Sequence, residues 1–210
     1  MAKHTSFGNC ELCGARVGKA AMARHLVTCI EANRDGVRGR VVLLRAYQTG
    51  SPVYWLHVAA RREAKLAEVD RLLRDVWLEC CGHLSEFYDR GRQTLNMKTR
   101  VDEALGAVGS HVGYVYDFGS STELVISHVA AIDAVVPKAP QVVARNQAPT
   151  WPCEVCDEPA TQVCVDCSND GGGFCCEKHS AEHPCGEEML LPVVNSPRMG
   201  VCGYAGGAAR

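Results

Sequence analysis

WPCEVCDEPATQVCVDCSNDGGGFCCEKHSAEHPC, residues 151–185, holds seven cysteines and two histidines. Three pairs of potential ligands share a two-residue gap: Cys153 and Cys156, Cys164 and Cys167, and Cys176 and His179. A Cys-x2-Cys turn lets two thiolates converge on one tetrahedral ion. With His183 and Cys185 the candidate ligands number eight, which is enough for two four-coordinate zinc ions.

We expect these pairs to alternate between two ions. Small two-zinc modules close a fold with hardly any core this way, because consecutive pairing would leave two independent loops. Cys175 is left over, since only Cys176 keeps the two-residue gap to His179. The two predicted sites are Cys153, Cys156, Cys176 and His179, and Cys164, Cys167, His183 and Cys185. Closed four-ligand shells leave no position for substrate, so both ions are expected to be structural.

This spacing resembles the cross-braced B-box and MYND-type zinc modules. The resemblance covers about 35 residues and implies a module that chiefly binds proteins. The segment 151–210 carries three basic and nine acidic side chains. We therefore expect a protein partner for this end of the chain and no affinity for anionic polymers.

A second ligand pattern lies near the N-terminus. In FGNCELCGARVGKAAMARHLVTC the candidate ligands are Cys10, Cys13, His25 and Cys29. A histidine and a cysteine four residues apart lie on one helix face, opposite a knuckle that supplies two thiolates. The pattern resembles a zinc finger in its Cys-Cys-His-Cys form. With the two sites above, the sequence predicts about three zinc ions.

The finger is poorly suited to reading DNA sequence. The side chains of base-reading fingers that touch bases correspond here to Gly18, Ala21 and Arg24, and glycine and alanine offer no hydrogen bonds to a base edge. Residues 1–50 nevertheless carry eight basic and three acidic side chains. The basic residues that could neutralise phosphates are Lys19, Arg24, Arg34, Arg38 and Arg40. Nonspecific nucleic-acid binding and a structural cap both stay open.

Composition sets the class and the compartment. The chain has 210 residues, of which 47% are hydrophobic, so a real core is available. The first residues lack the apolar run of a secretory signal, and no window approaches a membrane span. We expect a cytoplasmic protein without membrane contact. In that compartment thiols stay reduced, so the thirteen cysteines favour metal ligation over disulfides.

The predicted organisation has four parts. They are a finger at 5–32, an α+β domain at 40–133, a proline-rich linker at 134–152, and a two-zinc module with its tail at 153–210. In the domain, residues 40–47 and 52–59 read as strands, 62–81 and 101–108 as helices, and 111–118 with 122–129 as a hairpin. The fold class is α+β: a mostly antiparallel sheet with one main packing helix, flanked by two small zinc-binding modules.

Residues 52–130 resemble a known family. The segments YWLHVAARREAKLAEVDRLLRDVWLECCGHLSEF and YVYDFGSSTELVI are similar to the pRiA-plasmid open-reading-frame-three-like proteins, also described as passenger proteins of a bacterial insertion element. The tail MLLPVVNSPRMGVCGYAG resembles that of a long form in which a finger and a zinc cluster flank the domain. The resemblance implies an α+β fold and a link to mobile elements, but no established activity.

The leading functional prediction is a non-enzymatic zinc-binding adaptor. One alternative is a metal-dependent enzyme acting on nucleic acid, for which the candidate residues are His83, Glu86, Asp117 and Glu123. Two of these residues could instead have structural roles, with Asp117 accepting hydrogen bonds from turn amides and His83 capping a helix end. A third possibility is a purely structural zinc protein.

Three further cysteines are assigned no ligand role. The adjacent Cys80 and Cys81 lack a partner pair, so we expect them to pack at the end of a helix. Cys202 is expected to be a buried thiol, with replacement of a cluster ligand as the alternative.

Overall fold

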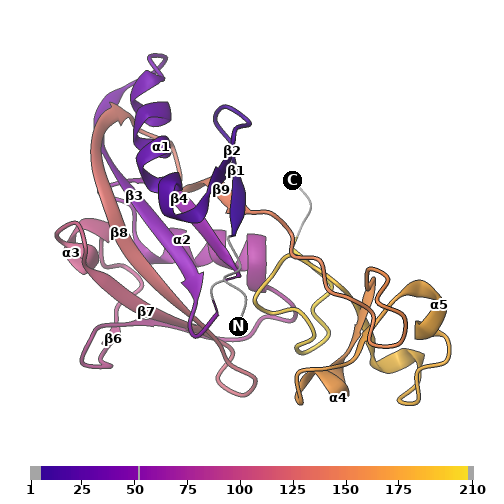
Figure 1. Cartoon of the computed structure of the whole chain (residues 1–210). Coiled ribbons are helices and arrows are strands. Elements are labelled where there is room, and N and C mark those ends of the chain that lie inside the picture. Colours follow the sequence, from indigo (N-terminus) through magenta and orange to yellow (C-terminus); the bar gives the residue numbers. More distant parts are fainter. Residues whose placement is uncertain (1–5, 52, 208–210) are drawn as a thin grey trace. The chain divides into compact units, whose positions relative to one another are not determined.

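The computed structural model describes residues 6–51 and 53–207. These residues divide into two compact units (Figure 1). The sheet unit contains the described residues up to Leu73 together with Leu84–Gln147. The cysteine-rich unit contains Arg74–His83 together with the described residues from Ala148 onward. Within the described ranges, no helix combines the length and the apolarity needed to cross a membrane.

A nine-stranded antiparallel sheet forms the frame of the sheet unit. Its strand order is β2-β1-β9-β4-β3-β8-β7-β5-β6. The strands are β1 (Phe7–Cys10), β2 (Arg16–Gly18), β3 (Arg38–Gln48), β4 (Trp55–Arg61), β5 (Ser85–Tyr88), β6 (Thr94–Leu95), β7 (His111–Tyr116), β8 (Thr122–Val135) and β9 (Gln141–Asn146). The predicted α+β class with a mostly antiparallel sheet is confirmed.

The predicted strands and the hairpin form the centre of this sheet. Residues 40–47 lie in β3 and most of 52–59 lie in β4, with Tyr47 opposite Trp55. The hairpin joins β7 to β8, with Tyr116 opposite Thr122. The pairing of β3 with β8 shifts at one bulge between Leu43 and Leu44. Short apolar runs rich in β-branched residues account for these strands.

One face of the sheet is covered by α1 (Lys19–Ala32), as Figure 1 shows. The helix buries Met22, Leu26 and Ile30 against strand residues that include Trp55 and Ile132. These apolar positions recur at a spacing of four residues and so form one stripe along the helix. The same helix carries His25 and Cys29 of the predicted finger, so the finger helix also serves the main core.

The opposite face is covered by α2 (Leu66–Leu73) and α3 (Val101–Leu105). The carboxylate of Asp70 on α2 accepts hydrogen bonds from Tyr114 Oη at 2.8 Å and from Ser85 Oγ at 2.6 Å. The ring of His128 on β8 lies 3.3 Å from the carbonyl oxygen of Leu105. The helix predicted at 62–81 is shorter than expected, since α2 begins at Leu66 and ends at Leu73. After Leu73 it continues as a π-helical turn, η1 (Arg74–Leu78).

The segment expected to be a linker, 134–152, contains β9. This strand lies between β1 and β4 and pairs with both. Its residues Val142, Val143 and Ala144 form the apolar middle of the strand, and Val143 and Ala144 are buried. The four prolines of the segment stand at 137, 140, 149 and 152, all outside β9, where no ladder amide is lost. Through β9 the finger hairpin β1-β2 joins the main sheet.

The cysteine-rich unit has little regular structure. A three-stranded sheet has the order β11-β10-β12, with β10 (Gln162–Cys164), β11 (Phe174–Cys175) and β12 (Leu190–Pro192). Its short helices are α4 (Val165–Ser168), α5 (Glu177–Ser180) and η2 (Glu187–Met189). The rings of Trp151 and Phe174 stack with their centroids 4.8 Å apart. In the same unit, Ser196 Oγ donates a hydrogen bond to the carbonyl of Trp77 at 2.6 Å, which attaches the tail to η1.

Candidate metal centres

The N-terminal group gathers as its spacing predicts. The ligand atoms of Cys10, Cys13, His25 and Cys29 all lie within 4.8 Å of one another. Cys10 ends β1, the turn that follows presents Cys13, and α1 supplies the other two. His25 Nε2 lies 3.3 Å from Cys13 Sγ and 3.4 Å from Cys29 Sγ. The amide of Gly14 donates to the carbonyl of Cys10 at 2.8 Å, which closes the knuckle.

The C-terminal ligands form two groups, and the pairs alternate between them as predicted. Cys153, Cys156, Cys176 and His179 form one group, and Cys164, Cys167, His183 and Cys185 form the other. In the first group, His179 Nδ1 lies 3.3 Å from Cys176 Sγ and 3.6 Å from Cys153 Sγ. In the second group, Cys167 Sγ lies 3.6 Å from His183 Nε2 and 3.8 Å from Cys185 Sγ.

Cys175 stands beside the second group without joining it. Its side chain is buried, and its Sγ lies 3.6 Å from His183 Nδ1, while Nε2 of the same ring points toward Cys167. A partner on the second ring nitrogen fixes the orientation of a ligating histidine. The cysteine that spacing leaves over is thus placed to orient a ligand.

The distances within the three groups fit a tetrahedral ion. Zinc–sulfur bonds of about 2.3 Å place two thiolates of one tetrahedron about 3.8 Å apart. The Sγ pairs of Cys13 with Cys29 and of Cys156 with Cys176 are each separated by 3.7 Å. A disulfide would require about 2.05 Å. None of the thirteen cysteines, all of which lie in the described ranges, forms a disulfide, so the geometry suits shared metal ions and not sulfur–sulfur bonds.

Backbone amides favour the thiolate form at two of the knuckles. The amide of Cys176 is the main cause that lowers the pKa of the Cys153 thiol to about 6. A hydrogen bond from the amide of Ala15 lowers the pKa of Cys13 to about 7. By contrast, the neighbouring sulfur of Cys164 raises the pKa of Cys167 to about 12. Several thiolates in one group repel one another, and a bound cation removes that repulsion.

A fourth group was missed from the sequence. Cys80, Cys81, His83 and Cys202 also bring their ligand atoms within 4.8 Å of one another, and all four belong to the cysteine-rich unit. The predictions of packing for Cys81 and of burial for Cys202 were wrong, because both side chains are exposed; Cys80 is half-buried just beyond η1, as expected of packing at a helix end. The signal in the sequence was Cys-Cys-x-His at 80–83, which does not have the usual two-residue gap. Its remaining ligand is 119 residues away along the chain.

The residues considered for catalysis serve other contacts. Asp117 adopts a φ of 65°, and its carboxylate accepts a hydrogen bond from the amide of Gly119 at 2.9 Å, which confirms the turn role. Glu86 accepts one from Thr94 Oγ1 at 3.1 Å. Glu123 lies in β8 opposite Val115. His83 lies among cysteines and not at a helix cap. In the described part of the chain, the three carboxylates form no group of three or more potential ligands within 4.8 Å.

The basic residues of the N-terminal region are only partly available to a polyanion. Arg24 and Arg34 are exposed. Arg40 forms an ion pair with Asp133 at 3.0 Å, and Arg38 donates to the carbonyl of the same residue. Lys19 is half-buried beside the ring of Tyr47, and this burial lowers its pKa.

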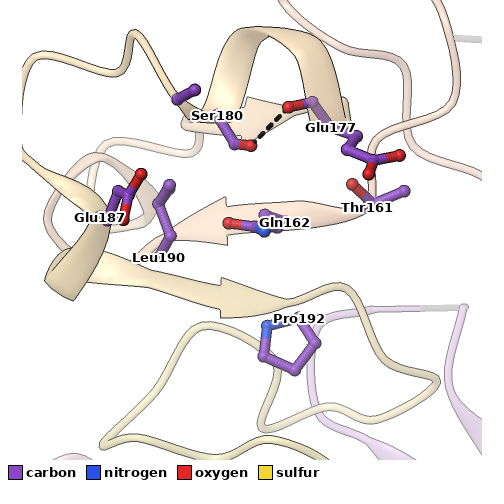
Figure 2. Close-up of a pocket in the computed structure, with 8 residues that line it drawn as sticks. Thr161, Gln162, Glu177, Ser180, Glu187, Leu190 and Pro192 are labelled. Carbon is purple, nitrogen blue, oxygen red and sulfur yellow. Dashed lines mark hydrogen bonds between the residues drawn. The ribbon is translucent and has the colours of Figure 1, made fainter.

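A pocket of about 560 Å³ lies on the cysteine-rich unit (Figure 2). Figure 2 shows Glu177 from α5 and Glu187 from η2 on either side of Gln162 from β10. Thr161, Ser180 and Ala181 line it as well, and Leu190 and Pro192 of β12 add apolar surface. The hydroxyl of Ser180 donates to the carbonyl of Glu177 at 2.8 Å. Two carboxylates over a partly apolar wall suit a long cationic side chain.

Comparisons with known proteins add little to this geometry. No protein-family model matches the sequence, and no curated protein matches it significantly. A crystal structure of a protein of unknown function from Methanosarcina mazei Go1 is similar with a TM-score of 0.41 and 14% identity. The similarity covers 48% of this chain and 66% of that chain. The resemblance to the pRiA-plasmid family therefore stays a prediction.

Proposed function

We propose that this protein is a non-enzymatic zinc-binding adaptor whose cysteine-rich unit binds a basic segment of a partner protein. The observation that carries the proposal is the pair of interleaved four-ligand groups at 153–185, next to an acidic pocket. Three thiolates and one imidazole form a donor set that is typical of structural zinc sites, whereas magnesium and calcium prefer oxygen ligands. Four protein ligands leave no open coordination position, so the ions have a structural role.

In this proposal the N-terminal zinc ion supports the fold of the sheet unit. Its ligands lie on β1, on the adjoining turn and on α1, and all of these elements contact the main sheet or its core. An ion at this position joins the first strand to the helix that covers the sheet. The structural cap thus has more support than a finger that reads DNA.

The docking surface is the pocket between Glu177 and Glu187. Segment 151–210 has nine acidic and three basic side chains, an excess of six negative charges. Each shell of three thiolates and one imidazole around Zn²⁺ adds about one further negative charge. An arginine or lysine of a partner would place its cation between the two carboxylates and its methylene groups against Leu190 and Pro192.

A peptide selection on the intact zinc-loaded protein tests this function. Displayed random peptides are selected, and the affinity of each selected peptide is measured by fluorescence anisotropy. We expect enrichment of lysine and arginine, and about tenfold weaker binding to the double variant Glu177→Gln and Glu187→Gln, which corresponds to about 1.4 kcal/mol. Glu158→Gln is the matched control, because this acidic residue is exposed but outside the pocket. Selection of acidic peptides, or equal binding by the double variant, contradicts the proposal.

A second candidate function is nonspecific nucleic-acid binding through the exposed side chains of Arg24 and Arg34. Binding of random duplex DNA and of RNA is measured against salt concentration. The double variant Arg24→Ala and Arg34→Ala loses two phosphate contacts, so the slope of the logarithm of the binding constant against the logarithm of the salt concentration should fall in magnitude by about two. Arg90→Ala, also exposed, is the control. A slope unchanged in the double variant excludes this surface.

A further inference from the structure

The group of Cys80, Cys81, His83 and Cys202 has the dimensions of a metal site. Cys81 Sγ lies 3.7 Å from Cys80 Sγ, 3.9 Å from Cys202 Sγ and 3.0 Å from His83 Nε2. His83 Nε2 lies 3.2 Å from Cys202 Sγ. The sulfur–sulfur distances match the edge of about 3.8 Å expected for a zinc tetrahedron. They are far from the bond of about 2.05 Å in a disulfide.

The segment that holds three of these ligands is fixed by its own hydrogen bonds. Beyond η1, the Glu79 amide donates to the carbonyl of Arg74 at 2.9 Å, and the two side chains form an ion pair at 2.6 Å. The carboxylate of Glu79 also accepts from the amide of Gly82 at 2.6 Å. Gly82 has a φ of 82°, which turns the backbone between Cys81 and His83. The chain therefore brings both side chains to one side of the loop.

The fourth ligand is presented by a turn of the tail. Cys202 has a φ of 50° and is followed by Gly203 at 70°. The amide of Val201 bonds to the carbonyl of Arg198, and the amide of Tyr204 bonds to the carbonyl of Val201. Ser196, a few residues earlier, bonds to Trp77. A left-handed backbone at a residue other than glycine is costly, and contacts on both sides hold Cys202 in it.

We propose that these four side chains bind a further zinc ion, which fastens the C-terminal tail to the loop after η1. Three thiolates and one imidazole give the same donor set as in the other three groups, so one metal suits all four. The site differs from them in exposure, since none of its four ligands is buried, whereas each of the other groups has at least one buried cysteine. Solvent and chelators reach it easily, so it loses its ion before the interleaved sites do. This inference does not depend on the docking function proposed above.

Zinc counting on the intact protein tests the site. Native mass spectrometry and elemental analysis should give four ions per chain, one for each group. Cys202→Ser should bind three. Ala205→Ser is the matched control: it alters an exposed residue of the same tail outside every group of four and should keep four. The tail of Cys202→Ser should also be cut faster by a protease, while residues 153–185 keep their protection.

Two results would overturn the fourth site. One is an equal zinc count in the unaltered protein and in Cys202→Ser. The other is a disulfide between Cys81 and Cys202 in peptides mapped without reduction. A second variant, His83→Ala, covers the case in which Cys202→Ser fails to fold. Failure of the interleaved sites would be distinct, because it removes ions that Cys153→Ser and Cys164→Ser control, whereas Cys202→Ser would still lower the count by one.

Discussion

The two units of this chain are stabilised in different ways. The sheet unit buries a continuous set of large apolar side chains, among them Trp55, Leu26 and Leu43. In the stretch 148–195, all of it described, Val163 is the only buried aliphatic or aromatic side chain, and the other buried apolar residues are four cysteines. Small folds with so little core need cross-links to be stable. Metal ligation should therefore decide the stability of residues 148–195 and contribute only a smaller part of the stability of the sheet unit.

Removal of zinc by a chelator should give the largest difference in stability between the two units. A structural zinc site can contribute about 10–16 kcal/mol of apparent binding free energy, most of which is folding free energy where the apolar core is as small as in residues 153–185. We expect residues 153–185 to lose hydrogen-exchange protection after zinc removal, while β3, β4 and β8 keep theirs. Hydrogen exchange with peptide resolution checks this. Persistent protection of 153–185 in a metal-free sample would refute the comparison.

Truncation of a core side chain should do the reverse. Trp55 is fully buried and is packed on Gly8, where an added Cβ would meet the indole ring at 2.4 Å. Trp55→Ala should reduce the free energy of unfolding of the sheet unit by about 3–5 kcal/mol in urea titrations. Zinc at residues 153–185 should stay bound. Val37→Ala, at a side chain that is 77% exposed, serves as the control with an effect below about 0.5 kcal/mol.

Substitution of a glycine in the cysteine-rich unit tests whether the close approach of its backbone to two ligand cysteines matters for stability. Gly173 has a φ of 85°, and an added Cβ would lie 2.7 Å from Cys167 Cβ and 3.1 Å from Cys164 Cβ. Gly173→Ala should destabilise this unit by about 1–3 kcal/mol and weaken zinc binding there. Gly171 has a similar φ of 82° but open space around it, so Gly171→Ala isolates the conformational cost. Equal effects of the two substitutions would mean that close approach to the ligands is unimportant.

A buried histidine should give the sheet unit a smaller dependence on pH. Burial, and then the charges of Arg45 and Lys19, lower the pKa of His57 from 6.5 to about 3. The unfolded chain therefore binds a proton that the folded chain does not, so stability is lost as the pH falls below about 6.5 and stops falling near 3. The expected loss is about 1 kcal/mol between pH 6 and 5.

The measurement is urea unfolding of the sheet unit at several pH values. His57→Gln should reduce the change in the free energy of unfolding with pH, whereas His111→Gln, at an exposed histidine, should not. Because all three proteins keep the same metal ligands, protonation of the zinc sites cancels in the comparison. If His57→Gln leaves the pH dependence unchanged, this ring takes up its proton equally in the folded and unfolded states, and its burial does not disfavour the charged form.

Local patterns in the sequence predicted the ligand groups best. Two-residue gaps specify a knuckle regardless of the surrounding fold. The choice of which pairs share an ion followed from the expectation that alternating pairs close one module, whereas consecutive pairs would leave two separate loops. The fourth group was missed because its ligands come from two segments that only the tertiary structure brings together, and adjacent cysteines are not a usual ligand pattern. Strand β9 was missed because its prolines suggested a linker, although every proline lies outside the strand. The short β5 and β6 offered too few residues for a periodic signal.

The position of β9 also has a consequence for the order in which the protein folds during synthesis. Strand β1 leaves the ribosome long before β9, which spans Gln141–Asn146 and is its neighbour in the sheet on the side away from β2. The hairpin β1-β2 must therefore wait until the chain has been translated through Asn146 before its edge is covered. An ion captured early by Cys10, Cys13, His25 and Cys29 would keep that unpaired edge in a fixed shape and away from other nascent chains during the delay.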